Sequence, residues 1–214
     1  PKFSILNPEY TYSVPKYQMV SGIFDIMSHL MEQYFSGDDD NTTDYIIEAI
    51  LLSLIHSTRI ALQNPTDYDA RSNIMWCATM ALNKITGVSK EQDWEVHAIE
   101  HQVGAYTDCT HGAGLAVVSI PYYKYIYRNG IAKFVRFAKN VWHIDTDHLT
   151  DDEAALAGID ALAKFIVEMG LPTRLRDLGT TEDMITKIAK STVPGGGYRR
   201  VEASDIEYIL RECF

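Results

Sequence analysis

Two pairs of metal-ligating side chains stand out in the sequence because each has the spacing of a helix. Asp25 and His29 are four residues apart among apolar neighbours, and His97 and His101 repeat this spacing further along the chain. Residues at positions i and i+4 of a helix lie on one face, with Cβ atoms roughly 5–6 Å apart. The two side chains of each pair can therefore reach one cation, although the first pair alone also fits a hydrogen-bonded Asp–His pair at a helix surface.

A further histidine, His111, follows His101 by ten positions. The intervening residues 104–110 can end one helix and turn the chain back, which would bring His111 near the start of the next helix. Imidazole nitrogens together with a carboxylate oxygen suit iron(II) or zinc, and they suit calcium poorly. Histidines and an aspartate from separate helices indicate a metal site built inside a helical bundle.

The same residues allow a competing interpretation. The segment from His97 to His101 also reads as H-x-x-E-H, the inverted zinc-protease motif, in which Glu100 would be the general base. This interpretation leaves Asp25, His29 and His111 without a role and requires a further carboxylate ligand that the motif does not identify. A metal-dependent hydrolase is therefore the second hypothesis, and a helical module whose histidines only pack is the third.

Apolar residues recur at helical spacing through most of the chain, which predicts an all-α fold, a multi-helix bundle. Pro121 is expected to interrupt or kink the fifth helix because proline lacks a backbone N–H. Trp76 is expected in the core, and only residues 2–6 are expected to be extended. Helices are expected between 15 and 37, over 43–62, 68–85 and 92–105, from 112 onward, and over 130–142, 151–169, 181–191 and 203–212.

The composition narrows the class of protein. The 214 residues are 46% hydrophobic and 22% charged, as in an ordinary globular protein, and the net charge of −10 argues against nucleic acid as a partner. No uninterrupted apolar run reaches the roughly 18 residues that span a bilayer, and no basic-then-apolar leader opens the sequence. Three widely spaced cysteines indicate free thiols and a cytoplasmic origin.

A dinucleotide-binding domain is not expected within these residues. The sequence lacks the βαβ alternation that such a sheet requires. Its one run of glycines, Gly195 to Gly197, follows Pro194 in a polar segment with no strand before it. A glycine turn that cradles phosphate links a strand to a helix, so this run is expected to be a surface loop.

Several motifs together resemble the group III iron-containing alcohol dehydrogenases, in the branch of the NAD(P)H-dependent butanol dehydrogenases. The resemblance covers nearly the whole chain and implies the C-terminal helical domain of that family, with its dehydroquinate synthase-like fold. It is carried by residues 6–12, the pair Asp25 and His29 followed by Glu32-Gln33-Tyr34, residues 64–71, 73–76 and 92–94, and the spacing of His97, His101 and His111.

The resemblance also implies a role for each of these residues. The metal ligands of the family match Asp25, His29, His97 and His111, and the ion would be Fe²⁺ or Zn²⁺. His101 matches a histidine near the nicotinamide and substrate, which makes it a candidate for proton relay. The implied reaction interconverts primary alcohols and aldehydes, such as butanol and butanal, with NAD(P)H, while the metal polarises the carbonyl as a Lewis acid.

Members of this family carry an N-terminal Rossmann-like domain that binds the cofactor. Residues 1–214 are therefore expected to form only the helical metal-binding domain, with little or no dehydrogenase activity by itself. The resemblance further implies a homodimer. It has one local departure, because Gly114 and the two residues after it stand where the family often has an asparagine after the last metal histidine.

Overall fold

The computed structural model describes residues 2–37 and 41–214, which form α-helices and short 3-10 helices without any β-strand. The predicted all-α fold is thereby confirmed for these residues. The 3-10 helices are η1 (Pro8–Thr11), η2 (Ile85–Gly87), η3 (Tyr127–Gly130) and η4 (Leu175–Leu178). The α-helices are α1 (Lys16–Tyr34), α2 (Thr42–Gln63), α3 (Tyr68–Leu82), α4 (Glu95–Thr107), α5 (His111–Ile126), α6 (Ile131–Asn140), α7 (Asp151–Met169), α8 (Glu182–Ser191) and α9 (Ala203–Glu212).

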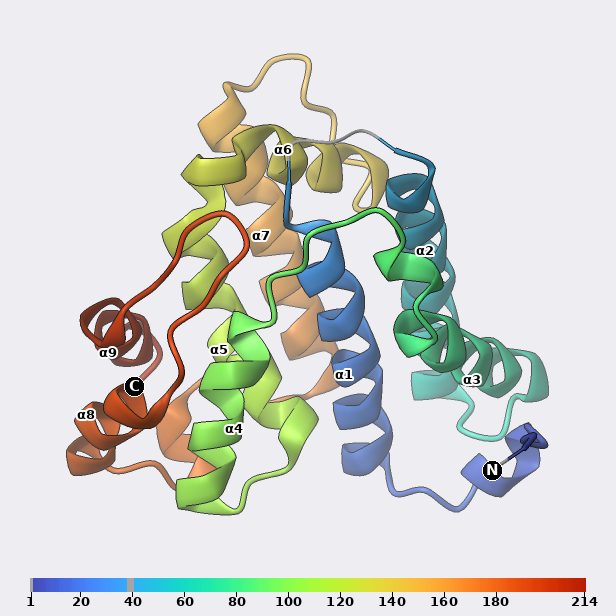
Figure 1. Cartoon of the computed structure of the whole chain (residues 1–214). Helices are drawn as coiled ribbons and strands as arrows, with labels where there is room; N and C mark the ends of the chain where they lie inside the picture. Colours follow the sequence, from blue (N-terminus) through green and yellow to red (C-terminus); the bar gives the residue numbers. More distant parts are fainter. Residues whose placement is uncertain (1, 38–40) are drawn as a thin grey trace.

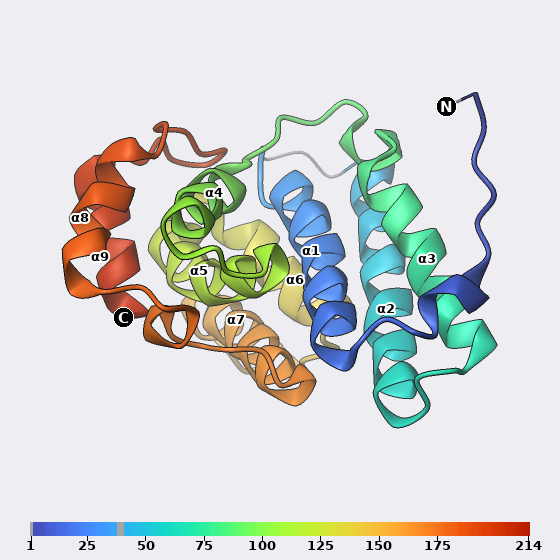
Figure 2. The same cartoon turned by 90° about the horizontal axis from the view of Figure 1, so that it is seen from below.

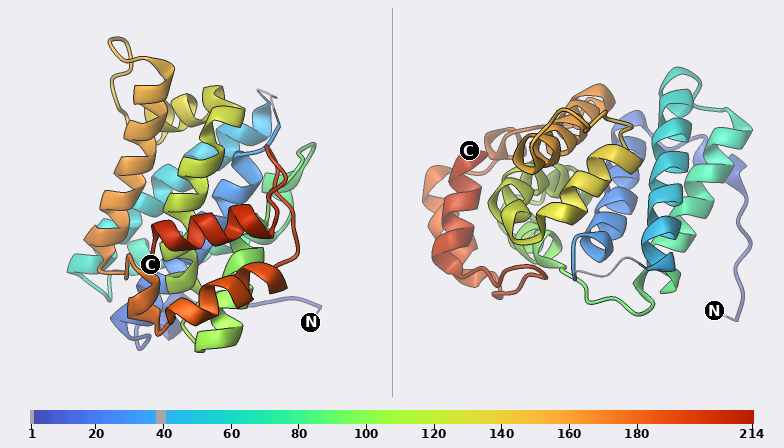
Figure 3. Two further views of the ribbon diagram at one scale, coloured as in Figure 1. Left: turned by 90° about the vertical axis from the view of Figure 1, so that its left-hand side faces the viewer. Right: turned by 90° about the horizontal axis from the view of Figure 1, so that it is seen from above.

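Helix α1 lies in the middle of the fold (Figure 1). Seen from below, α2 and α3 lie on one side of it and α4 and α5 on the other (Figure 2), and α1 contacts all four helices. Helices α8 and α9 pack together outside α4 and α5, while α7 packs against α5 and α6 (Figure 3). This central position explains why α1 is buried nearly all round, since a helix that is apolar on every side belongs in a core.

Local sequence signals set several of the helix ends. The side chain of Asp67 accepts a hydrogen bond of 2.9 Å from the backbone N–H of Ala70 at the start of α3, as expected for an N-cap. Thr150 and Glu153 form a capping box at the start of α7, and Gly170 ends that helix with a φ of 79°. These features explain why α3 and α7 begin at the expected residues.

The helices differ from the expected ones at three points. Helix α5 is not interrupted at Pro121, because one missing backbone hydrogen bond is outweighed by a helix that is buried along most of its length. Helix α3 ends three residues early, since the left-handed Lys84 leads into a 3-10 turn. Helix α4 starts at Glu95, directly after the left-handed Trp94, whereas its start was expected near residue 92.

Helix α2 is long and apolar enough to cross a membrane by length and composition alone. Half of its most apolar window is nevertheless buried inside the fold, where α2 packs against α1 and α3. A helix in the core of a globular protein passes the same test of composition. The packing therefore indicates that α2 is a core helix of this bundle.

Candidate metal centre

Helices α1 and α5 approach each other closely at Gly112, the second residue of α5. A Cβ atom at this position would lie 1.9 Å from the backbone oxygen of Ser21 on α1, so a larger residue would push the helices apart. Ser21 precedes Asp25 by about one helical turn, and Gly112 directly follows His111. This backbone contact therefore brings the side chains of Asp25 and His111 together.

The turn between α4 and α5 brings His111 opposite the two histidines of α4. Asp108 ends α4 in the left-handed conformation, with a φ of 55°, and α5 begins three residues later. A connection this short joins antiparallel neighbours. The ring centroid of His111 lies 5.3 Å from that of His97 and 5.4 Å from that of His101. The turn expected within residues 104–110 is thus found at the end of that segment.

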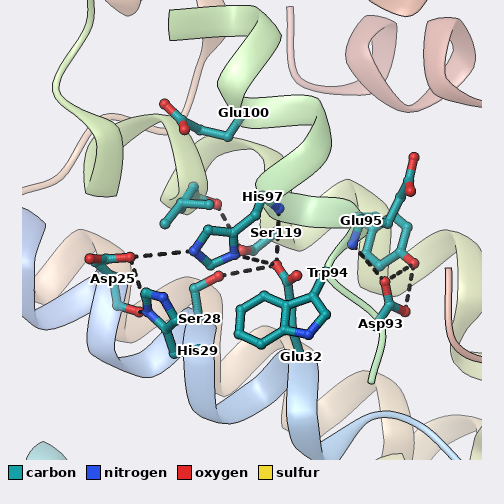
Figure 4. Close-up of polar contacts among 12 residues, drawn as sticks. Asp25, Ser28, His29, Glu32, Asp93, Trp94, Glu95, His97, Glu100 and Ser119 are labelled. Carbon is teal, nitrogen blue, oxygen red and sulfur yellow. Dashed lines mark hydrogen bonds and ion pairs between the residues drawn. The ribbon is translucent and has the colours of Figure 1, made fainter. Parts of the chain in front are cut away.

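Donor atoms of Asp25, His97 and His111 converge where α1, α4 and α5 meet, all within 4.8 Å of one another. Oδ1 of Asp25 lies 3.5 Å from Nε2 of His97 and 3.5 Å from Nε2 of His111. These separations are long for hydrogen bonds. Two ligands on one tetrahedral ion, with bonds of ~2.1 Å, would lie about 3.4 Å apart. Figure 4 shows Asp25 and His97 facing each other across this gap.

Two of the converging atoms are buried without a hydrogen-bond partner, namely Oδ1 of Asp25 and Nε2 of His97. Burying a polar atom without a partner costs free energy, and a shared cation would satisfy both atoms. One carboxylate oxygen with two imidazole nitrogens is a donor set for Fe²⁺ or Zn²⁺. The residues present therefore fit the ion that the sequence predicts.

His29, the fourth predicted ligand, lies beside these three residues without being part of their convergence. Its Nδ1 is 2.8 Å from the backbone oxygen of Asp25 and 3.2 Å from Oδ1 of the same residue. Because a carbonyl oxygen can only accept, Nδ1 carries the proton and Nε2 keeps its lone pair. The ring centroid of His29 is 4.6 Å from that of His97, so a nitrogen able to bind metal stands next to the other donors.

His101, the predicted proton relay, lies at the solvent-exposed rim of the site. Its ring stacks on His111 with an interplanar angle of 25° and approaches His97 edge-on at 6.0 Å between centroids. An exposed imidazole beside the predicted ligands can exchange protons with water. The fold therefore brings all five predicted site residues into one cluster where α1, α4 and α5 meet.

Two buried carboxylates lie behind the converging imidazoles. Oε1 of Glu32 is 3.1 Å from Nδ1 of His97, and Glu100 is hydrogen-bonded to Nδ1 of His111. Glu32 is fully buried and Glu100 is 2% exposed. Each carboxylate contacts the ring nitrogen that does not face Asp25, so the two rings are held from behind.

These carboxylates raise the pKa of both imidazoles. Burial lowers the pKa of His97, but the nearby carboxylates of Asp25 and Glu32 outweigh burial and raise the pKa to about 9. The nearby carboxylates of Asp25 and Glu100 raise the pKa of His111 to about 10. Burial acts to raise the pKa of Asp25, yet the neighbouring histidines hold that pKa far below its usual range. A metal ion competes with protons for such nitrogens, so its affinity depends on pH.

Two residues of the site had no role assigned from the sequence, Glu32 and Trp94. The ring of Trp94 meets His29 and His97 edge-on, with centroids 5.6 Å and 5.3 Å apart. Glu32 follows Asp25 by seven residues, or about two helical turns, so its place on the same face of α1 was visible in the spacing. No comparable signal existed for Trp94, whose position depends on the left-handed turn before α4.

One cavity of the described residues lies away from this cluster. It has a volume of about 830 Å³, and residues of α5, α7 and α9 line it. The smaller cavity, of about 520 Å³, is lined by Gln33, Gln92 and Trp94 among others. Since Trp94 contacts the histidines, the smaller cavity is the one adjacent to the candidate metal centre.

Comparison with known proteins decides the family. A sequence profile described as the C-terminal part of the Fe-containing alcohol dehydrogenase family matches residues 19–214. The chain belongs to this family. The iron-containing alcohol dehydrogenase family was also the one indicated by the sequence motifs, and the profile covers every residue of the cluster at α1, α4 and α5.

Relatives within the family include the NADH-dependent butanol dehydrogenase B of Clostridium acetobutylicum, which is 41% identical over 99% of this chain and 56% of its own length. The NADPH-dependent aldehyde reductase YqhD of Escherichia coli is 35% identical over 96% of this chain and 53% of its own length. The crystal structure of the NADH-dependent butanol dehydrogenase A of Thermotoga maritima matches with a TM-score of 0.93 and 34% identity, over 100% of this chain and 56% of that one. The chain thus spans about half the length of these relatives.

The hydrolase alternative is not supported. The relatives are dehydrogenases and reductases by name. Glu100, the general base in that alternative, contacts the Nδ1 of His111 that faces away from Asp25. A base needs to reach water at the open side of the ion, and the observed contact gives Glu100 a different position.

Proposed function

We propose that this chain is the helical metal-binding domain of an oxidoreductase that interconverts primary alcohols and aldehydes with NAD(P)H. The observation that carries the proposal is the convergence of Oδ1 of Asp25 with the Nε2 atoms of His97 and His111. Membership of the iron-containing alcohol dehydrogenase family supports it. Relatives named as butanol dehydrogenases and an aldehyde reductase support the substrate class.

In this proposal Asp25, His29, His97 and His111 hold one Fe²⁺ or Zn²⁺. The bound ion supplies Lewis acidity toward the oxygen of the aldehyde or alcohol. Asp25 offsets part of the positive charge, and the buried position of His97 keeps water from that side of the site. His101 is the candidate that exchanges the proton of the alcohol with solvent, because it is exposed and stacks on His111.

The nicotinamide cofactor is proposed to bind to a further domain of the full-length protein. The relatives that depend on NADH or NADPH are about twice as long as this chain, and the residues described here contain no strand for a dinucleotide-binding sheet. We therefore assign residues 1–214 to the helical metal-binding domain. By the family resemblance we also propose a cytoplasmic homodimer, which fits the three free cysteines.

The metal site is tested first, on the chain depleted of metal and then given Zn²⁺ or Fe²⁺. We expect one ion per chain, and we expect His111→Ala to lose it. His56→Ala is the matched control, because His56 is an exposed histidine of α2 outside the cluster. Binding that survives in a folded His111→Ala protein would contradict the proposed ligand set.

Activity requires a cofactor domain, so the second test fuses this chain to the N-terminal half of a butanol dehydrogenase relative. Consumption of NAD(P)H with butanal is then followed by absorbance. We expect turnover in the metal-loaded fusion and none after removal of the metal. A folded fusion that binds both metal and NAD(P)H and still leaves butanal unreduced would count against the substrate class.

A further inference from the structure

The two ring nitrogens that face away from Asp25 have the same kind of partner. Nδ1 of His97 meets Oε1 of Glu32 at 3.1 Å, and Nδ1 of His111 meets Oε2 of Glu100. A carboxylate only accepts hydrogen bonds, so both Nδ1 atoms must carry protons and both Nε2 atoms can offer lone pairs. The partners thus select the tautomer whose Nε2 atom faces Asp25.

We propose that Glu32 and Glu100 are positioning residues that orient His97 and His111 for metal binding. The inference rests on the proposed metal site and adds two residues that do not themselves contact the ion. Metal-binding histidines usually donate their other N–H to a carboxylate or carbonyl, which fixes the ring and raises its basicity. Here one α1 residue and one α4 residue supply both carboxylates.

Glu32 is held so that it can fix the ring of His97 firmly. Its Oε1 accepts from Nδ1 and from the backbone N–H of His97, each at 3.1 Å, and from the hydroxyl of Ser28 at 3.3 Å. The backbone of Glu32 also takes part, since its carbonyl accepts from the N–H of Asp93 at 2.9 Å. One oxygen therefore fixes both the backbone and the ring of His97 relative to α1.

Glu100 occupies a space that glycine provides. A Cβ at Gly114 would lie 2.6 Å from Oε1 and 2.7 Å from Cγ of Glu100, so any side chain at 114 would displace this carboxylate. The missing side chain at Gly114 therefore leaves room for Glu100 between α4 and α5, directly behind His111.

A second cation is the competing explanation for Glu100, because donor atoms of Glu100, His101 and His111 also lie within 4.8 Å of one another. That arrangement would require Nδ1 of His111 to bind metal, with no proton between it and Glu100. The two explanations predict different stoichiometries. One ion per chain agrees with the positioning role, and two ions per chain overturn it for Glu100.

The test measures Zn²⁺ affinity by chelator competition in the whole chain. We expect Glu32→Leu and Glu100→Leu to bind about 10- to 100-fold more weakly, and Glu32→Gln and Glu100→Gln to lie between Leu and the unchanged protein. Glu95→Gln is the control, because Glu95 is 1% exposed and makes no hydrogen bond to a histidine among the described residues. Its affinity should change by less than about twofold, since no ring loses its partner.

The tautomer gives a readout that general destabilisation would not move. In Zn²⁺-loaded protein, ¹H–¹⁵N spectra of the imidazoles should show protonated Nδ1 for His97 and His111, with the assigned signal lost or shifted in the matching Leu variant. If circular dichroism shows that Glu100→Leu does not fold, Gly114→Ala is used in its place. Its added Cβ would displace the Glu100 carboxylate, so it should also weaken Zn²⁺ binding.

The outcomes separate the two proposals. Unchanged affinity and unchanged tautomers in folded variants would overturn the positioning role while leaving the metal site intact. Failure of the unmutated chain to bind Zn²⁺, Fe²⁺ or Co²⁺ would instead overturn the proposed function on which the inference rests.

Discussion

The backbone oxygen of Ser21 lies so close to Gly112 that a Cβ there would be 1.9 Å from it. The Ser21 oxygen and the Cα atom that would carry this Cβ both belong to helix backbones, so neither can move aside without shifting α1 against α5. We expect Gly112→Ala to lower the free energy of unfolding by about 3 kcal/mol. The same shift would draw Asp25 away from His111, so metal affinity should also fall.

Urea unfolding and Zn²⁺ competition measure these two effects. The control is Gly22→Ala, because Gly22 is an exposed residue of α1 whose added Cβ would meet nothing within 4 Å. That variant should gain up to about 1 kcal/mol, since alanine favours a helix over glycine. Equal behaviour of the two variants would show that the close contact at 112 does not matter.

Trp94 should report metal binding by its fluorescence. Its ring lies edge-on to His29 and His97, with centroids 5.6 Å and 5.3 Å away, whereas the chain has only two other tryptophans. Co²⁺ quenches a nearby indole, so titration with Co²⁺ should lower the emission until one ion is bound. The quenching should largely disappear in Trp94→Phe and persist in Trp76→Phe. Quenching that is lost in Trp76→Phe instead would place the ion away from Trp94.

Substitutions of His101 and His111 should affect catalysis and metal binding separately in the fused enzyme. His101→Ala should keep one ion per chain, because His101 lies at the exposed rim, and should lower kcat by roughly 100-fold as a proton relay is lost. His111→Ala should lose the ion itself. Metal analysis and steady-state kinetics with butanal check both, and loss of metal from His101→Ala would mean that the relay assignment is wrong.

Asp44 should be a main contributor to stability. Its buried carboxylate pairs with Nζ of Lys90 at 2.6 Å and with Nζ of Lys133 at 2.5 Å, which ties α2 to α6 and to the segment before α4. Breaking a buried ion pair by removing one partner costs about 3–5 kcal/mol. We expect Asp44→Asn to lose stability on that scale in urea unfolding at pH 7, and Asp183→Asn, at an exposed pair, to change little.

The same residue gives a pH dependence. Burial acts to raise the pKa of Asp44, but its hydrogen bonds with Lys133 and Lys90 outweigh burial and hold the pKa below its usual value of 3.8. The stability from this group is therefore present above pH 3.8 and is lost as the pH falls through the lower pKa of the folded state. Between pH 5 and pH 3 the unchanged protein should lose more stability than Asp44→Asn, and parallel curves would contradict this.

The clustering of the predicted site residues could largely be expected from the sequence, because side chains on one helix face recur at helical spacing. The spacing of Asp25 and His29 and of His97 and His101 predicted each pair on one helix face, and the short segment before His111 allowed the chain to turn back. Which donors converge most closely could not be read from spacing. That depends on how near α1 comes to α5, and hence on a backbone contact at Gly112.

Other features required the tertiary structure. Trp76 was expected in the core but is 55% exposed, because α3 lies at the edge of the bundle and only one of its faces packs against α1 and α2. Pro121 was expected to interrupt or kink the fifth helix, and α5 is not interrupted there, since packing on α5 outweighs a single missing N–H.

The candidate metal centre is buried on one side and exposed to solvent on the other. Side chains of His111 and Asp25 are 40% and 33% exposed, whereas those of His97 and Glu32 are 9% and 0% exposed. Small molecules can therefore approach the predicted ligands from the side of Asp25 and His111. In the proposed enzyme, an alcohol, a chelator and the nicotinamide ring would share this open side, so occupancy of one should exclude or order the entry of the next.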